Sequence, residues 1–201
     1  MKCFEYGEIE KNHLKEADTN MKELIHGLGH INREVNPDIF SALIDSIIGQ
    51  QISTKAATTV KAKIRLLVDE ITPKSIYELS LEDIKLCGMS YRKAEYIKDA
   101  ADSFLNGDLH SKDLRAMNDK EVIDSLVSIR GVGKWTAEML LIFSLNRKNI
   151  LSYDDLGIRR GLMKVYNLDS LTKEFFNELK IKYSPYASIA SLYIWEAAST
   201  K

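Results

Sequence analysis

Apolar residues recur at intervals of three and four along most of this chain, the spacing of one helix face. Asn36 and Pro37 look like a helix cap followed by proline at the first helical position, with an apolar stripe behind them. Gly49 ends this stripe, and Ser53 or Thr54 can cap a second helix. The apolar positions are Ile39, Phe40, Leu43, Ile44, Ile47 and Ile48 in the first helix, and Ala56, Val60, Ile64 and Leu67 in the second.

The same periodicity predicts helices over much of the remaining chain, whereas no alternating pattern of useful length predicts a strand. Three prolines and ten glycines leave long windows without helix breakers. The expected helices lie near residues 91–106, 119–129, 134–147, 155–165, 172–183 and 186–199. The fold class that follows is all-α.

A weak internal repeat relates residues 84–97 to residues 127–140. In this alignment Gly88 falls on Gly131, and an Ala-Glu pair follows each glycine at the same distance. Chance is one explanation, because a glycine between apolar residues is common. The other is that the chain carries two helix-turn-helix units of the same kind.

Composition excludes several classes of protein. With 201 residues, 45% of them hydrophobic, the chain can bury a core as one domain or two small ones. No apolar run approaches the roughly 20 residues that span a bilayer, and the first residues lack the apolar part of a signal peptide. Two cysteines are too few for a disulfide framework or an iron–sulfur cluster. A net charge of −1 argues against a protein that coats nucleic acid, but allows one that grips a few phosphates.

The most informative segment joins two apolar helices through the turn Gly131-Val132-Gly133 and then leads to Asp155, just before a third helix. Glycines allow the backbone to turn sharply and bring its amides close to an anion. A helix N-terminus behind such a turn suits a phosphodiester. A phosphate grip, an aromatic side chain (Trp135) and a single carboxylate together predict an enzyme that acts on a base in DNA.

Four segments, in this order, resemble the helix-hairpin-helix DNA glycosylases (HhH-GPD superfamily), specifically the 3-methyladenine DNA glycosylase II (AlkA-type) branch. They are Ile48-Gly-Gln-Gln-Ile-Ser53, Ile129-Arg-Gly-Val-Gly-Lys-Trp-Thr-Ala137, Asp154-Asp-Leu-Gly-Ile158 and Ala190-Ser-Leu-Tyr-Ile-Trp195. The resemblance covers roughly residues 36–200. Larger members carry an extra N-terminal β domain, and so few residues precede the first motif here that the chain looks like the compact form.

The resemblance implies one glycosylase unit, residues 1–201, made of two helical subdomains that flank a cleft. One subdomain would span about residues 36–150, and the other about residues 1–35 plus 151–201. At the tip between the first two predicted helices, Gln51 would fill the gap left by an extruded base, with Gln50 beside it. A solvated helix end is the alternative role of Gln51.

The hairpin would hold one DNA phosphate, a contact that positions the enzyme without reading sequence. The amides of Val132, Gly133 and Lys134 would point at that phosphate. Hairpin carbonyls in such families often hold a monovalent cation, Na⁺ or K⁺, and no other cofactor is expected. The phosphate-binding residues expected from the resemblance are Gly131, Val132, Gly133, Lys134 and Thr136, and the cation would take the carbonyls of Val127, Ile129 and Val132. Further candidates for phosphate contact are Lys55, Arg92, Lys93, Arg159 and Arg160.

Asp155 matches the family's catalytic aspartate, which directly precedes Leu156-Gly157 here. Cleavage of an N-glycosidic bond builds positive charge on the deoxyribose, and a fixed carboxylate stabilises that oxocarbenium-like state. A helix N-terminus also favours ionised aspartate, by about 0.3–1 kcal/mol at exposed sites. The alternative role is an N-cap, worth about 1 kcal/mol, and both roles can hold together. Asp154 would then be the structural member of the pair.

Trp135 and Trp195 are the two tryptophans of the chain. Either could pack in a core, but both fall on positions that line the base pocket in the family, as do Met139 and Tyr153. An electron-rich ring attracts a cation by about 0.5–2 kcal/mol, and N3- or N7-alkylated purines are cationic. Met139 and Glu196 stand where AlkA-type enzymes often have tyrosines, which makes this pocket less aromatic.

Trp135 also bears on the mechanism. In the lyase branch of the superfamily, a Schiff-base lysine occupies the position that matches Trp135. Lys134 is one residue away and so points elsewhere on the helix. The resemblance therefore implies a monofunctional glycosylase, without AP-lyase activity, that leaves an abasic site.

The expected function is hydrolysis of the N-glycosidic bond of alkylated purines, of the 3-methyladenine and 7-methylguanine type, in base excision repair by base flipping. The expected partner is double-stranded DNA with a damaged base. We expect a monomer without membrane contact, located in the cytoplasm or, in a prokaryote, at the nucleoid. Two alternatives are the same scaffold acting on deaminated, oxidised or mismatched bases, and a non-catalytic module that binds damaged DNA.

Overall fold

The computed structural model of this chain describes residues 2–107, 109 and 111–200. Internal contacts divide the chain into two compact units. We call Asn36–Leu140 the continuous unit, and Met1–Val35 together with Leu141–Lys201 the split unit. The subdomain boundary expected near residue 150 thus lies ten residues earlier by this division, inside the helix Lys134–Phe143.

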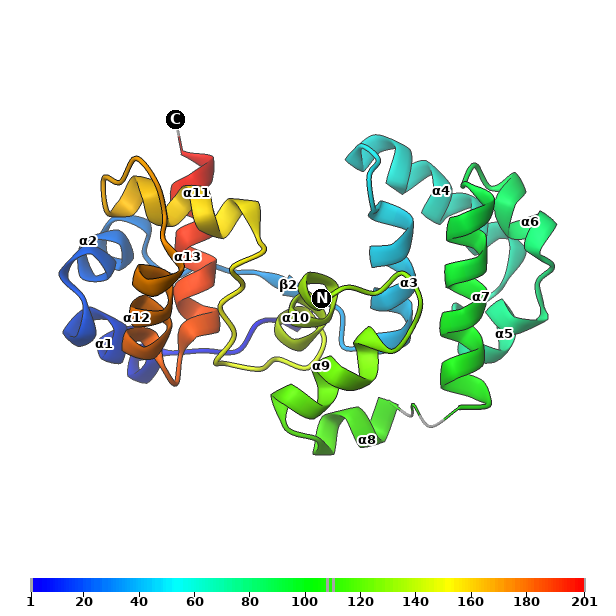
Figure 1. The fold of residues 1–201 in the computed structure, drawn as a ribbon, viewed down its shortest axis with the longest axis horizontal. Helices are drawn as coiled ribbons and strands as arrows, with labels where there is room; N and C mark the ends of the chain where they lie inside the picture. The colour runs from blue at the N-terminus through cyan, green and yellow to red at the C-terminus, as the bar shows by residue number, and fades with distance from the viewer. Residues whose placement is uncertain (1, 108, 110, 201) are drawn as a thin grey trace. The chain divides into compact units, whose positions relative to one another are not determined.

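The continuous unit is built from helices joined by short turns, coloured cyan to green in Figure 1. The long helix α7 packs against α3, α5 and α6, and α4 packs against α3. The helices are α3 (Ile39–Gly49), α4 (Thr54–Leu67), α5 (Pro73–Glu78), α6 (Leu81–Leu86), α7 (Tyr91–Leu105), α8 (Ser111–Ala116), α9 (Asp119–Val127) and α10 (Lys134–Phe143), the last of which crosses the boundary.

The first predicted helix is confirmed, although its start was wrong. The six apolar residues of the predicted stripe are the buried residues of α3. Asp38, not Asn36, caps the helix, because its carboxylate accepts the amide N–H of Ser41. Asn36 instead accepts the amide N–H of Asp38 at 3.1 Å, a turn that leads into the helix. Ser53 caps α4 by accepting the amide N–H of Ala56.

The two halves of the sequence repeat have the same local form. Gly88 follows α6 with φ +105°, and Gly131 follows α9 with φ +83°. Glycine adopts this left-handed conformation without steric cost. The helices α7 and α10 then begin at equivalent positions of the repeat, Tyr91 and Lys134. The structure therefore supports two helix-turn-helix units of one kind over a chance match.

The split unit combines helices from the first and the last part of the chain, which pack around α13 (Ala187–Ser199) (Figure 1). α11 packs along α13, and α1, α2 and α12 also contact it. Gly161 makes the α11 contact close, because a Cβ there would lie 2.2 Å from the carbonyl oxygen of Ile194. The helices are α1 (Glu8–Ala17), α2 (Thr19–Leu28), α11 (Leu156–Val165), α12 (Lys173–Tyr183) and α13 (Ala187–Ser199).

One strand pair departs from the expected absence of strands. β1 (Lys2–Cys3) pairs antiparallel with β2 (Glu34–Val35) within the split unit. Strands of two residues are too short to give an alternating sequence pattern. None of the helices over the described ranges is both long and apolar enough to cross a membrane.

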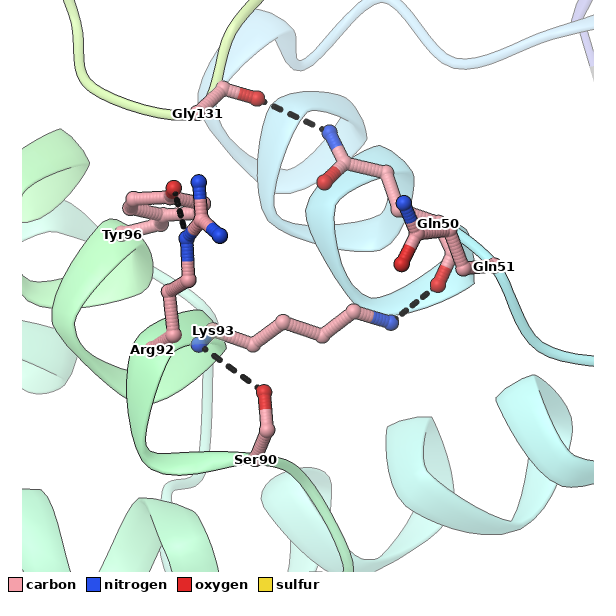
Figure 2. Close-up of a pocket in the computed structure, with 7 residues that line it drawn as sticks. All are labelled: Gln50, Gln51, Ser90, Arg92, Lys93, Tyr96 and Gly131. Atoms are coloured by element: carbon pink, nitrogen blue, oxygen red, sulfur yellow. Dashed lines mark hydrogen bonds between the residues drawn. The ribbon is translucent and has the colours of Figure 1, made fainter.

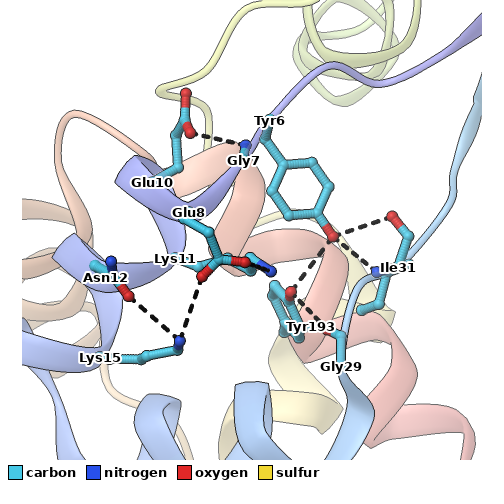
Figure 3. Close-up of polar contacts among 10 residues, drawn as sticks. All are labelled: Tyr6, Gly7, Glu8, Glu10, Lys11, Asn12, Lys15, Gly29, Ile31 and Tyr193. Atoms are coloured by element: carbon cyan, nitrogen blue, oxygen red, sulfur yellow. Dashed lines mark hydrogen bonds and ion pairs between the residues drawn. The ribbon is translucent and has the colours of Figure 1, made fainter.

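Tyr6 fastens the N-terminal segment to α13, as Figure 3 shows. Its hydroxyl accepts the amide N–H of Ile31 at 2.8 Å and lies 3.0 Å from the Ile31 carbonyl oxygen. The hydroxyl of the fully buried Tyr193 lies 3.3 Å away and donates to the carbonyl of Gly29. These hydrogen bonds give partners to the two tyrosine hydroxyls, which would cost free energy if they were buried without one.

Candidate active site and DNA-binding turns

Asp155 begins α11 and is only 8% exposed. Its Oδ1 accepts the amide N–H of Ile158 at 2.8 Å, which is the N-cap bond expected of an aspartate at this position. The same oxygen accepts the indole N–H of Trp195 at 2.9 Å. Two donors on one oxygen hold the carboxylate in a single orientation at the positive end of a helix dipole.

Trp195 lies on α13 and is packed closely on several sides. Its ring centroid is 5.5 Å from that of Phe143, and the guanidinium of Arg33 lies 5.4 Å from the Phe143 centroid. A Cβ at Gly157 would lie 2.8 Å from Cδ1 of Trp195 and 3.1 Å from Oδ1 of Asp155. The contact between indole and carboxylate therefore requires a residue without a side chain at position 157.

The loop that carries Asp155 is anchored by the same helix. Ser188 accepts the amide N–H of Ile150 at 2.8 Å and donates to the carbonyl of Arg147 at 2.6 Å. Ser191 donates to the carbonyl of Ile150 at 3.1 Å. Ser188, Ser191 and Trp195 are spaced by three and four residues, so they share one face of α13. This face holds the loop and the carboxylate at its end.

Tyr153 belongs to another cluster of the split unit. Its ring packs edge-on against Phe176, with centroids 5.1 Å apart. The cationic groups of Arg159 and Lys173 lie 5.4 and 5.5 Å from the Tyr153 centroid. Tyr153 is therefore committed to an aromatic–cation cluster, and its predicted place in a base pocket stays a prediction. Arg159, a predicted phosphate contact, belongs to the same cluster.

The hairpin turn between α9 and α10 is shaped by Gly131. Gly131 has a positive φ. In addition, a Cβ at this position would lie 2.1 Å from Cδ2 in the ring of Tyr96, a residue of α7. The backbone of the turn therefore lies directly against the Tyr96 ring. By contrast, a Cβ at Gly133 would meet no atom within 4 Å. The two glycines of the motif thus have different roles, and Gly131 has the structural one.

The expected use of three hairpin amides is corrected at Val132. The Val132 amide donates to the carbonyl of Ile129 at 3.1 Å, and its side chain is buried. It therefore closes the turn and does not point at a phosphate. Gly133 and Lys134 are exposed, and neither amide is a donor in the hydrogen bonds found among the described residues. Thr136 is only 3% exposed, so its side chain is too buried to reach a phosphate in this conformation.

The tip between α3 and α4 lies against the hairpin within the continuous unit, as Figure 2 shows. Gln51 is exposed and has φ +58°, a left-handed conformation that few residues with side chains adopt. Gln50 donates from Nε2 to the carbonyl of Gly131 at 2.9 Å. Lys93 donates to the carbonyls of Ile48 and Gln50, and burial lowers the pKa of its ammonium group.

A cavity of about 280 Å³ lies beside this tip. Gln50 and Gln51 form one side of it, and residues of α7 with the preceding Ser90 form another (Figure 2). Arg92 contributes its guanidinium, which lies 5.5 Å from the ring centroid of Tyr96. The lining residues are Gln50, Gln51, Ser90, Arg92, Lys93, Tyr96 and Gly131.

Trp135 and Met139 both lie on α10, in the part that belongs to the continuous unit. Trp135 is 40% exposed, unusually high for a tryptophan, whereas Met139 is half-buried. Their assignment to the base pocket stays a prediction. Of the expected cation ligands, Val127 ends α9, and the carbonyl of Ile129 already accepts one N–H. Over the described residues, no group of three or more His, Cys, Asp or Glu side chains could hold a metal ion.

Three residues of the carboxylate site were not singled out from the sequence: Gly157, Phe143 and Arg33. Gly157 belongs to the motif Asp154-Asp-Leu-Gly-Ile158. A glycine two residues after the predicted catalytic aspartate indicates that another group approaches the backbone closely at that position. Phe143 ended the apolar run of the hairpin helix. Arg33 gave no signal, because it lies in a loop with no periodic pattern.

Comparisons with known proteins agree on one family. Residues 44–185 match the family described as HhH-GPD superfamily base excision DNA repair protein. The chain is 31% identical to DNA-3-methyladenine glycosylase 1 of Schizosaccharomyces pombe, over 92% of this chain and 85% of the relative. It is 32% identical to DNA-3-methyladenine glycosylase of Saccharomyces cerevisiae, over 81% of this chain and 68% of the relative.

Solved structures give the same result. A DNA-3-methyladenine glycosidase from Bacillus halodurans superposes with a TM-score of 0.91 and 32% identity, over 100% of this chain and 94% of that one. The 3-methyladenine DNA glycosylase of Schizosaccharomyces pombe, in complex with abasic DNA, gives a TM-score of 0.84 and 30% identity, over 96% and 97%. The chain therefore belongs to the HhH-GPD superfamily of base excision DNA repair proteins.

Proposed function

We propose that this protein is a monofunctional DNA glycosylase that hydrolyses the N-glycosidic bond of alkylated purines in duplex DNA. The observation that carries the proposal is the Asp155 carboxylate, buried at a helix start with two N–H donors on Oδ1. A carboxylate fixed in this way loses no energy to reorientation when positive charge develops on the deoxyribose. The C1′–N bond breaks and the base leaves as a neutral purine, water adds to C1′ and releases a proton to solvent, and an abasic site remains.

The names of the relatives support alkylated purines as the substrate class. These proteins are called DNA-3-methyladenine glycosylase or glycosidase. N3- and N7-alkylated purines are cationic and are good leaving groups, so no second carboxylate has to protonate them. The indole of Trp195, held beside Asp155, would offer an electron-rich surface that attracts such a base.

DNA would be held through the hairpin. The exposed amides of Gly133 and Lys134 lie at the N-terminus of α10, where the helix dipole favours a phosphate. The Lys134 side chain adds positive charge there, although it also lies 3.8 Å from Glu138. A Na⁺ or K⁺ ion bound by the carbonyls of Val127, Ile129 and Val132 would suit the same phosphate. Gln51, exposed at the α3–α4 tip, would fill the gap left by the extruded base.

The absence of lyase activity is part of the proposal. A lyase needs an amine that attacks the sugar and forms a Schiff base. Trp135 occupies the position that a lysine holds in the lyase branch, and Lys134 is paired with Glu138 on another side of the helix. We therefore expect intact DNA strands after base release.

The test compares wild type with Asp155→Asn on a duplex that carries a single 7-methylguanine. Asparagine is as good an N-cap as aspartate, so α11 keeps its start while the negative charge is lost. We expect base release to fall by at least about a hundredfold, with an unchanged duplex affinity. Equal rates for the two proteins would overturn the proposal. Denaturing gels before and after alkali would show strand breaks, and breaks without alkali would contradict the monofunctional assignment.

The second arm of this experiment uses methylated genomic DNA and identifies the bases that are released. Released 3-methyladenine and 7-methylguanine would fit the proposal. Parallel duplexes with a deaminated base, an oxidised base and a mismatched pyrimidine test the alternative substrates. Faster release of one of these bases would assign the protein to that substrate class instead of alkylated purines. Binding without turnover on every duplex would identify a non-catalytic module that binds damaged DNA.

A further inference from the structure

Gln50 joins two turns that are far apart in sequence. Its backbone ends α3, directly before Gln51, and its side chain reaches the hairpin. There Nε2 donates to the carbonyl of Gly131 at 2.9 Å (Figure 2). This bond lies entirely within the continuous unit, so it connects two parts of one compact body.

The helix α7 contacts both the turn after α3 and the hairpin turn at Gly131. Near its start, Lys93 donates to the carbonyls of Ile48 and Gln50 and so holds the last turn of α3. One turn further along, the ring of Tyr96 lies against Gly131. Carbonyls at a helix C-terminus lack partners inside the helix, and a cation there satisfies them. Gln50, Lys93 and Tyr96 thus form a link between the two turns, which we call the Gln50 bridge.

The bridge limits how Gln51 can move relative to the hairpin. Gln51 is the next residue after Gln50 and has φ +58°, a conformation that costs energy and persists only where the surrounding structure imposes it. Lys93 fixes the backbone oxygen of Gln50, and Gly131 fixes its side chain. The residue directly before Gln51 is therefore held both by α7 and by the turn that is proposed to bind a phosphate.

We propose that Gln50 is a positioning residue that couples phosphate capture at the hairpin to base extrusion by Gln51. This rests on the proposed function, because it assigns Gln51 as the wedge and the hairpin as the phosphate grip. It differs from the expectation that Gln50 belongs to the wedge beside Gln51, since its side chain is committed to Gly131. Gln50 would act by aligning its neighbour and would not touch the damaged base.

The test separates binding from extrusion. Gln50→Ala removes the bridge, and Gln50→Glu keeps the size but replaces the donor with a carboxylate that faces a carbonyl. Binding is measured on undamaged duplex over a series of salt concentrations, because the slope reports the number of phosphates contacted. Extrusion is measured by the fluorescence of 2-aminopurine placed next to a 7-methylguanine, which rises when its stacking neighbour leaves.

We expect both variants to bind undamaged duplex within about twofold of wild type and with the same salt slope. The extrusion signal and the single-turnover excision rate should fall by about fivefold, the value of one hydrogen bond of roughly 1 kcal/mol. Gln51→Ala should give a similar loss. The double variant of positions 50 and 51 should lose no more than Gln51→Ala alone, because the bridge acts through the wedge.

A matched control is Asn106→Ala. Asn106 is the C-cap of α7 in the same unit, and the side-chain hydrogen bond found for it among the described residues goes to Asp102 of that helix. Asn106→Ala should change neither binding nor extrusion. Such a result excludes a general effect of removing a polar side chain at a helix C-terminus. Thermal unfolding of each variant checks that the fold is kept.

Two results would overturn the proposal. One is a Gln50→Ala protein that loses duplex affinity or salt slope as strongly as extrusion, since the residue would then only support the hairpin. The other is a double variant whose losses multiply. Full excision by Asp155→Asn would instead refute the proposed function, and the extrusion signal, which needs no chemistry, would still report on Gln50.

Discussion

The indole nitrogen of Trp195 lies 2.9 Å from Oδ1 of Asp155, so one helix, α13, orients the carboxylate that another helix, α11, carries. The amide of Ile158 donates to the same oxygen. The N-cap role and the catalytic role weighed from the sequence are therefore compatible, since capping supplies one of the two bonds that fix the acid. The second bond gives Trp195 a structural role besides its predicted place in the base pocket.

Trp195→Phe should slow base release by about tenfold or more. The variant keeps an aromatic ring but removes the donor to a charged oxygen, a bond worth about 1.5–3 kcal/mol. Because the loss concerns orientation of the acid, it should appear in kcat more than in KM, measured on a 7-methylguanine duplex. Trp135→Phe removes the N–H of the other tryptophan, and an equal fall in kcat from both changes would contradict this role.

Gly157→Ala should lower kcat by a similar factor while it changes stability little. The new Cβ would lie 2.8 Å from Cδ1 of Trp195 and force the indole away from Asp155. Overpacking costs about 1–3 kcal/mol, but alanine in place of a helical glycine regains up to about 1 kcal/mol. Excision kinetics and urea unfolding measure the two effects separately.

The same change should be nearly harmless in a Trp195→Ala background, because removal of the ring removes the Cδ1 and Nε1 atoms that the new Cβ would meet. A double-mutant cycle over kcat would then show strong non-additivity. Independent, multiplying losses would mean that Gly157 acts through some contact other than Trp195.

Gly131→Ala should destabilise the protein by about 2–4 kcal/mol, through a positive φ and a close contact with Tyr96. Gly133→Ala is the matched control, since a Cβ there meets open space and should cost less than about 1 kcal/mol. Urea unfolding gives both values. A Tyr96→Ala background should recover the part of the Gly131 loss that comes from the ring, and equal losses for the two glycines would contradict the assignment.

Glu10 should make stability depend on acid pH. Its carboxylate lies 2.5 Å from the Lys148 ammonium, which lowers the Glu10 pKa from its ordinary value of 4.5 to about 2. A lowered pKa in the folded state stabilises the protein above pH 4.5, and this contribution is lost as the pH falls towards 2. Glu10→Gln should therefore unfold more easily than wild type near pH 7, by roughly 1 kcal/mol.

The difference between Glu10→Gln and wild type should shrink between pH 4.5 and 2, as followed by urea unfolding at a series of pH values. Lys148→Met, which removes the partner, should reproduce the same trend. A difference that stays constant down to pH 2 would show that the glutamate acts through its backbone cap at Gly7 and not through its charge.

Much of the fold followed from the sequence where helices carry a regular apolar face. α3 was found with all six of its buried positions, and α13 was expected within one residue of its start. α1 and α2 were missed, because the buried residues of α1 are Glu10 and Leu14 and those of α2 are Met21 and Ile25. Two buried positions per helix form too weak a stripe, and tertiary packing supplies the rest of the stability.

The site could be named residue by residue but not assembled. Asp155 and Trp195 were singled out separately, whereas the bond between them is a tertiary contact that no local pattern encodes. Val132 was misjudged for a related reason, since the use of its amide depends on how tightly the turn closes. The bond from Gln50 to the carbonyl of Gly131 is likewise a tertiary contact that no local pattern encodes.

The split of the chain into a continuous and an interrupted unit sets an order of assembly during synthesis. The residues proposed to contact DNA lie between Gln50 and Lys134, within the uninterrupted stretch of chain that forms the continuous unit. Asp155 gains its second hydrogen bond only after Trp195 has been translated. A nascent protein would thus complete the turns proposed to bind DNA before the proposed catalytic carboxylate gains its second hydrogen bond.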